Sequence, residues 1–146
     1  MLDVLTGALV EVLHQADTKP TKPSISVVQE RAATLPSKWR AFARCVSHRE
    51  SHGNPKAVNR SSGAAGIYQW MPNWRHGIRY IVARGLKANG STAKYARDVR
   101  ERLPYRIEKW SAKWQQIAFV QIINEGGRSA AFRHWNGGHG CNALIP

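Results

Sequence analysis

The chain has 146 residues, of which 42% are hydrophobic and six are tryptophan, so it is long enough for one folded domain and too apolar for a disordered tail. Its 22 Lys and Arg against 9 Asp and Glu give a formal charge of +13, which favours a polyanionic partner such as nucleic acid, anionic lipid or an anionic cell wall. No apolar run reaches the roughly 18 residues of a membrane-spanning helix, and the N-terminus, which is apolar but carries acids and no basic start, is a poor secretory signal.

Residues 1–35 differ from the rest of the chain in charge and in pattern. They carry three Lys or Arg and four Asp or Glu, whereas residues 36–146 carry 19 and five. Leucines recur at helical spacing over residues 2–14, and two prolines with Thr, Ser and Lys follow over residues 16–26, which is typical of a linker. We therefore expect an N-terminal helix and linker at 1–35 and a compact domain at 36–146.

The first helix of this domain is predicted over residues 35–50, "LPSKWRAFARCVSHRE". Its apolar positions fall on one helical face: Trp39, Phe42, Ala43 and Val46. Glu50 lies four residues beyond the last of these and continues the stripe. Gly53 and Pro55 end the helix, and a loop rich in Gly, Ser and Asn follows.

The rest of the chain predicts helices and loops. Residues 75–114 hold eleven Lys or Arg and three acids, broken by "GLKANGST" and by Pro104, which indicates two or more basic helices with a solvated face. The apolar run 117–123 predicts a buried helix that ends at Gly126, and the glycine-rich tail 131–146 is expected to be loop. No stretch keeps the alternation of a strand, so we predict an all-α fold class, with minor β structure at most.

Two cysteines, Cys45 and Cys141, lie 96 residues apart. They are either two reduced, buried thiols or one disulfide that ties the C-terminal tail to the helix before Glu50. In the chain-entropy model, a disulfide that closes so long a loop adds roughly 4 kcal/mol to the free energy of unfolding.

Glu50 is the only acid between Glu30 and Asp98, and two interpretations fit it. On an apolar face near the C-terminal end of a helix, desolvation and the helix dipole both favour the protonated carboxylic acid, which suits a general acid. If the side chain turns outward, it pairs instead with Arg49 or another of the abundant cations. Spacing alone does not choose between a catalytic acid and an ion pair.

The segment that starts at Glu50 resembles the signature of the lytic transglycosylases of the soluble (Slt) type. In that family a Glu-Ser pair precedes Asn-Pro-x-Ala and then Gly-Ala-x-Gly-hydrophobic-x-Gln-x-x-Pro; here the blocks read ES at 50–51, NPKA at 54–57 and GAAGIYQWMP at 63–72. More weakly, WNGG at 135–138 resembles the family's Tyr-Asn-Ala-Gly. Residues 113–127 are also similar to a helix of the resuscitation-promoting factors, which share the lysozyme-like fold.

The resemblance implies a lysozyme-like fold and an enzyme that cleaves the β-1,4 bond between N-acetylmuramic acid and N-acetylglucosamine in peptidoglycan. The family's single Glu, matching Glu50, protonates the glycosidic oxygen and then acts as base on the muramyl 6-hydroxyl, so the product is a 1,6-anhydro sugar. The family's Ser and Gln match Ser51 and Gln69, which would hydrogen-bond the saccharide or its peptide. No metal and no organic cofactor is implied.

The remaining candidate binding residues are aromatic or lie in the WNGG segment. Trp70, Trp74 and Trp135 lie on the loops around the motifs and are candidates for stacking on sugar rings, as is Tyr68 in the block 63–72. Asn136 and the two glycines after it would form a wall of the cleft. The other three tryptophans are expected in the core: Trp39, Trp110 and Trp114.

Trp135 stands where the family has a tyrosine that lies near the Glu and helps to orient it. An indole donates a hydrogen bond but cannot accept one, so the product is either the anhydro sugar or, as in lysozymes, a hydrolysed reducing end. Hydrolysis needs a second acid, for which Asp98, Glu101 and Glu125 are the candidates.

Three other functions compete with this interpretation. His48 and His52 flank Glu50 as in a zinc helix, but the zincin pattern places the Glu directly after the first His. The cations of residues 75–114 would suit a nucleic-acid-binding module. An inert virion or envelope structural protein could also keep a lysozyme-like fold.

The expected partners are peptidoglycan strands and, through the basic surface, anionic cell-wall polymers. Because the N-terminus is a poor secretory signal, we expect a phage endolysin or a virion-associated lysin, made in the cytoplasm and delivered by a holin or on the particle. Residues 1–35 would then contact virion tail or capsid proteins. A bacterial enzyme exported by a dedicated machine is the alternative.

Overall fold

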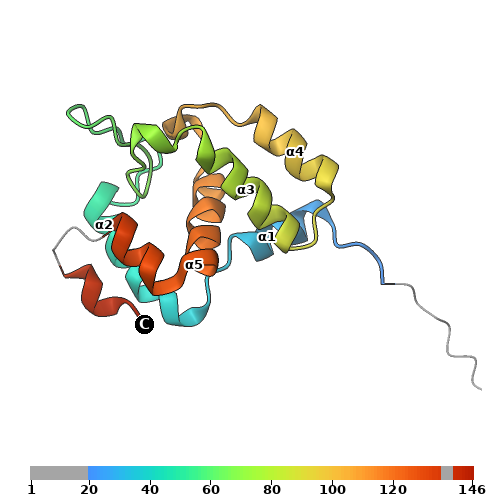
Figure 1. Cartoon of the computed structure of the whole chain (residues 1–146), viewed down its shortest axis with the longest axis horizontal. Coiled ribbons are helices and arrows are strands. Elements are labelled where there is room, and N and C mark those ends of the chain that lie inside the picture. Colours follow the sequence, from blue (N-terminus) through green and yellow to red (C-terminus); the bar gives the residue numbers. More distant parts are fainter. Residues whose placement is uncertain (1–19, 136–139) are drawn as a thin grey trace, which may run out of the picture.

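The computed structural model describes residues 20–135 and 140–146 (Figure 1). Within these ranges the chain forms five α-helices and no strand, which confirms the predicted all-α class. The helices are α1 Ile25–Ala32, α2 Arg40–Ser51, α3 Gly77–Ala88, α4 Ala93–Arg102 and α5 Ala112–Trp135. None of these described helices is long and apolar enough to cross a membrane. The helix predicted at 2–14 lies outside the described residues.

Helix α5 lies at the centre of the fold, where α1 and α3 pack against it and α4 packs against α3 (Figure 1). Every residue from 117 to 123 is buried, as the apolar run predicted. Val28 and Ala32 of α1 are buried in the same core. Helix α1 is therefore part of this core, although it lies on the N-terminal side of the boundary predicted at residue 35.

Helix α5 does not end at Gly126, which corrects the prediction. The chain bends at Gly127, whose φ of 50° and ψ of −134° are not helical, and continues as helix to Trp135. Glycine adopts such angles without the steric cost that a side chain brings. The bend places Ala130, Ala131 and Trp135 in the core, so the first part of the tail predicted as loop is helical.

Helix α2 follows the apolar stripe in the sequence. A 3₁₀ turn at Ser37–Trp39 leads into it. It buries three side chains: Phe42, Ala43 and Val46. The helix ends at His52, a left-handed residue with φ 52° whose backbone N–H donates to His48 O at 3.0 Å. Gly53, which is also left-handed, turns the chain into the loop, as the sequence predicted.

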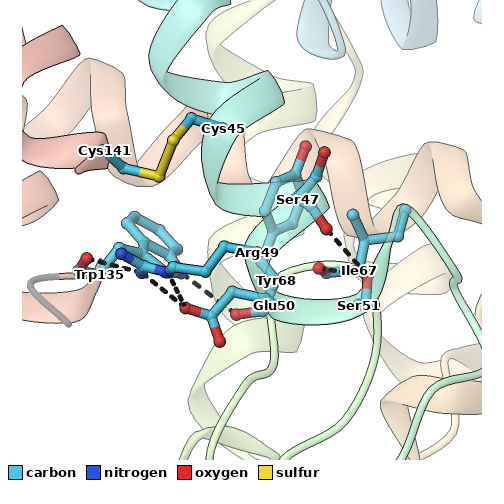
Figure 2. Close-up of polar contacts among 9 residues, drawn as sticks. All are labelled: Cys45, Ser47, Arg49, Glu50, Ser51, Ile67, Tyr68, Trp135 and Cys141. Carbon is cyan, nitrogen blue, oxygen red and sulfur yellow. Dashed lines mark hydrogen bonds and ion pairs between the residues drawn. A yellow bond between two sulfur atoms is a disulfide. The ribbon is translucent and has the colours of Figure 1, made fainter. Parts of the chain in front are cut away.

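A disulfide fastens the last described residues to α2. Cys45 of α2 is bonded to Cys141, with 5.6 Å between their Cα atoms (Figure 2). Cys141 begins a short 3₁₀ helix, Cys141–Leu144, that packs against α2. Of the two interpretations of the cysteines, the structure has the disulfide.

A buried glutamine holds the loop between α2 and α3. Gln115 of α5 accepts a hydrogen bond from the Ile67 N–H at 2.7 Å and donates to Pro55 O at 2.9 Å. Gly66 passes so close to this amide that a Cβ at Gly66 would lie 3.0 Å from Gln115 Cδ. The path of the loop therefore requires glycine at this point. Isolated β-bridges join other loop residues: Val58 with Ala65, and Ala65 with Trp70.

Candidate active site

Glu50 lies in the last turn of α2, where the helix meets the loop before α3. Ser51, the next residue, donates its hydroxyl proton to Ile67 O at 2.8 Å, with Ser47 O at 3.3 Å as a second acceptor (Figure 2). This bond joins the helix that carries Glu50 to the loop that carries Gln69, two residues after Ile67. Residues of the first and third motif blocks thus meet at one end of α2.

The Glu50 carboxylate is held by the residue before it. Arg49 donates from Nε and Nη2 to Glu50 Oε1, at 3.0 and 2.6 Å (Figure 2). The side chains of Arg49 and Glu50 are 19% and 26% exposed. Glu50 is therefore half-buried and not fully buried like the apolar stripe before it, and it pairs with Arg49 as the alternative interpretation expected. Because the pair is mostly buried, it is better shielded from solvent than an ordinary surface ion pair.

Arg49 also connects this carboxylate to the end of α5. Its Nη2 donates to Trp135 O at 2.8 Å, which is one of the last carbonyls of the helix and has no partner within it. Arg49 Nη1 is buried and has no hydrogen-bond partner among the described residues. The guanidinium fixes the position of Glu50 Oε1, while no residue in the described part of the chain donates to Oε2.

The Trp135 side chain is packed in the core. It is 3% exposed, and its Nε1 donates to Tyr68 O at 3.2 Å. The ring centroid of Trp70 lies 5.4 Å from that of Trp135. The contact from Trp135 to Glu50 runs through the Trp135 carbonyl and Arg49, whereas the lytic transglycosylases that the sequence resembles use a tyrosine side chain.

Three of the predicted aromatic binding residues are buried: Tyr68, Trp70 and Trp135. Burial raises the pKa of the Tyr68 phenol, whose hydroxyl donates to Gln116 Oε1. None of the three rings offers an open face to a sugar in this structure. Trp74 is half-buried, with its ring centroid 4.6 Å from that of His134. Of the tryptophans expected in the core, Trp39 and Trp110 are buried and Trp114 packs partly buried against it.

Gln69 is held in an uncommon backbone conformation. Its φ is 49°, a left-handed value that costs a non-glycine residue on the order of 1–3 kcal/mol and occurs most often at functional sites. Its side-chain Nε2 donates to Gly66 O at 3.0 Å, which fixes the amide within the loop. Asn136, the last predicted binding residue, lies outside the described residues.

The three acids considered as a second catalytic group have partners of their own. Each forms an ion pair on α3, α4 or α5: Asp98 with Lys94 at 2.7 Å, Glu101 with Arg100 at 3.3 Å, and Glu125 with Arg84 at 2.7 Å. The hydrogen bond from Lys94 lowers the pKa of Asp98, and the one from Arg84 lowers the pKa of Glu125. None of these acids contacts Glu50 in the described part of the chain.

His48 and His52 lie close together on either side of Glu50, with 4.7 Å between their ring centroids. A zinc site needs further ligands beside such a pair. Among residues 20–135 and 140–146, no group of three or more His, Cys, Asp or Glu is placed to hold a metal ion.

Residues 28–93 match the family model of the transglycosylase SLT domain. This stretch, which is just under half of the chain, is similar to the transglycosylase SLT domain. The match begins within α1 and covers α2, the loop and α3. It includes Glu50, Ser51 and Gln69, and Trp135 lies beyond it. The resemblance to lytic transglycosylases is thereby confirmed. Comparison with curated proteins and with solved structures gives no significant match.

The SLT domain implies lytic transglycosylase activity on peptidoglycan, so the chain is an enzyme that acts on the cell wall. Sequence reasoning treated the Arg49 pair only as a rival to a catalytic role for Glu50. In the structure, that pair lies within the segment that matches the SLT family model. The sequence signal for this pair is the arginine directly before the motif glutamate.

Proposed function

We propose that the chain cleaves the β-1,4 bond between N-acetylmuramic acid and N-acetylglucosamine, with Glu50 as the single acid and base and a 1,6-anhydro sugar as product. The observation that carries the proposal is the Glu50 carboxylate, which Arg49 holds through one oxygen where the motif segments meet. The SLT family match supports the same chemistry.

The reaction uses the carboxyl group twice. As the carboxylic acid, Glu50 gives its proton to the oxygen that links the two sugars, and the bond from that oxygen to muramyl C1 breaks. N-acetylglucosamine leaves with a free 4-hydroxyl. The Glu50 carboxylate then takes the proton of the muramyl 6-hydroxyl while that oxygen bonds to C1. No water is consumed, so one carboxyl group serves where most glycosidases need two.

Arg49 acts in this cycle as a positioning residue. A guanidinium does not release its proton in proteins, so Arg49 does not compete with Glu50 as the acid. It stabilises the carboxylate that forms after the first proton transfer. Because it occupies Oε1, it leaves Oε2 for the proton.

Ser51 and Gln69 have different parts in the proposal. The Ser51 hydroxyl proton is used by backbone carbonyls, so Ser51 positions the loop and can only accept a hydrogen bond from the substrate. Gln69 is half-buried, and its amide donates to a carbonyl of the same loop. We assign direct contact with the saccharide to Gln69.

Digestion of purified peptidoglycan followed by mass spectrometry tests this function. We expect fragments that end in 1,6-anhydromuramic acid, and release slowed by about 10³-fold in Glu50→Gln. Reducing ends with an added water would assign hydrolysis as in lysozymes, a candidate that the separate ion pairs of the other acids disfavour. A folded enzyme that releases no fragments would refute both.

The place of action follows from the disulfide and the substrate. The Cys45–Cys141 bond suits an oxidising compartment outside the cytoplasm, where peptidoglycan lies. A phage endolysin, a virion-associated lysin and an exported bacterial enzyme all meet this condition, and the phage origin favoured in the sequence analysis stays a hypothesis. Copurification of the chain with intact phage particles would support the virion form.

A further inference from the structure

We propose that a group of exposed aromatic rings and half-buried arginines binds the peptidoglycan strand beyond the reacting sugars. This tyrosine–arginine patch lies on α3, α4 and the segment after α4. Its members are His76, Arg79, Tyr80, Arg100 and Tyr105. The inference rests on the proposed function, because it takes the proposed substrate, peptidoglycan, as the partner. It adds a second region of the protein that contacts this polymer.

Tyr105 forms one end of the patch and is 53% exposed. The Arg79 guanidinium carbon lies 4.4 Å from the centroid of its ring. The His76 ring is nearly parallel to it, at 13° and 6.1 Å between centroids. Arg79 forms no ion pair with a described carboxylate, and its Nε is buried without a hydrogen-bond partner among the described residues. The charge of this guanidinium is therefore not neutralised within the described part of the chain.

Tyr80 forms the other end and is 41% exposed. The Arg100 guanidinium carbon lies 4.7 Å from its ring centroid, and the His76 ring lies 5.6 Å from it. Arg100 also contacts Glu101 at 3.3 Å, which offsets part of its charge. His76 thus connects the two tyrosines into one continuous surface of rings.

Single exposed aromatic side chains are common on proteins, but adjoining ones mark a binding surface more often. Helix α3, which carries Arg79 and Tyr80, has no acidic residue. The patch therefore presents two exposed tyrosine rings, each with a guanidinium group over one face. A ligand that fits it has apolar ring faces and negative charges at short intervals.

The patch continues a line of contacts that starts at the candidate active site. The Trp135 carbonyl binds Arg49, and His134, the residue before it, contacts the Trp74 ring at 4.6 Å. His76 follows Trp74 by two residues. His76 is the residue before α3. In Figure 1 the start of α3 lies at the same end of the molecule as the loop after α2.

A peptidoglycan strand has the required chemistry. Its sugars present C–H faces that stack on aromatic rings, and its stem peptides carry carboxylates that pair with guanidinium groups. Single-stranded nucleic acid also combines flat rings with anionic groups. The strand is favoured because the patch adjoins the Glu50 site of a domain that acts on peptidoglycan.

The test removes both tyrosine rings in the full chain, as Tyr80→Ala with Tyr105→Ala. We expect about tenfold weaker binding to insoluble peptidoglycan sacculi in a co-sedimentation assay, and a KM on sacculi raised by the same factor. On a purified tetrasaccharide kcat should be unchanged, because neither tyrosine contacts Glu50 or Arg49 in the described part of the chain. Arg79→Gln with Arg100→Gln should weaken sacculus binding and reduce its salt dependence.

Phe132→Ala is the matched control. Phe132 is exposed on α5, and the Arg128 guanidinium carbon lies 6.0 Å from its ring centroid. The control therefore removes the same kind of ring contact outside the patch. We expect its sacculus binding to equal that of the wild type. Thermal unfolding of every variant is measured to check that the fold is retained.

Several outcomes would overturn the proposal. A folded Tyr80→Ala, Tyr105→Ala variant that binds sacculi within twofold of the wild type refutes it, as does a loss no larger than that of Phe132→Ala. Weaker binding to a single-stranded oligonucleotide with unchanged sacculus binding assigns the patch to nucleic acid. If the patch binds sacculi but the wild type releases no anhydro sugar, the binding surface stands and the proposed activity fails.

Discussion

Replacement of Arg49 by Gln tests whether its guanidinium positions the Glu50 carboxylate. The change removes two hydrogen bonds to Glu50 Oε1 and one to the Trp135 carbonyl. Because Arg49 is proposed to contact Glu50 and not the substrate, we expect kcat to fall while KM for short glycan fragments stays within about twofold.

The size of the effect follows from the bonds that are lost. A hydrogen bond to a charged group contributes about 1.5–3 kcal/mol, and partial exposure of both side chains places this pair toward the lower limit. The two bonds share one carboxylate oxygen, so we count them as one interaction. A loss of about 2 kcal/mol from the reacting state slows kcat about thirtyfold.

The assay measures release of anhydromuramyl ends from soluble peptidoglycan fragments. Arg49→Lys is the matched variant, because one ammonium group lacks the fork that reaches both Glu50 and the Trp135 carbonyl; its kcat should fall between those of the wild type and Arg49→Gln. Thermal unfolding separates a catalytic effect from a loss of fold. A folded Arg49→Gln enzyme with kcat within twofold of the wild type would refute the positioning role.

Other substitutions test the acid, the disulfide and a half-buried histidine. Glu50→Gln should slow anhydro-sugar release by about 10³-fold without lowering Tm; a smaller loss would point to another acid. Cys45→Ser with Cys141→Ser should lower the free energy of unfolding by about 2–5 kcal/mol in a denaturant titration, and an unchanged midpoint would contradict this. Burial lowers the pKa of His134 from 6.5, so the folded protein favours the neutral imidazole. The contribution of this group to the free energy of unfolding is present above pH 6.5 and is lost as pH falls through the folded-state pKa. The Tm of His134→Gln should therefore fall less than that of the wild type between pH 7 and 5, and equal slopes would disprove it.

Helix α2 and the loop after it were predictable because their signals are local. The apolar stripe repeats at helical spacing over residues 39–46, and a glycine and a proline follow within a few residues. The motif glutamate is placed by this pattern alone. Its neighbours in space, however, come from α5 and the loop, and no short-range pattern reports them.

The course of α5 could not be read from the sequence. Two adjacent glycines usually end a helix, and here Gly126 and Gly127 instead permit a bend between two helical stretches. The second stretch forms because Ala130, Ala131 and Trp135 find room in the core. Whether such room exists depends on the packing of the whole domain.

The roles predicted for the aromatic motif residues were limited by the same lack of packing information. Trp70 and Trp135 lie in the motif segments, which suggested that their rings stack on sugar. In the structure their rings lie 5.4 Å apart and fill the space between the loop and α5. A tryptophan in a motif segment can therefore pack in the core under the loop and need not face a substrate.

The position of Glu50 depends on two successive attachments between α2 and the C-terminal part of the chain. Cys45 is one helical turn before Arg49, so the disulfide to Cys141 and the hydrogen bond to the Trp135 carbonyl lie on the same side of α2 (Figure 2). The indole at position 135 cannot take over a tyrosine's contact, because its N–H is used by a buried carbonyl. A backbone carbonyl does not depend on the side chain that follows it. An arginine held by that carbonyl can therefore orient the carboxylate whichever aromatic residue fills the core.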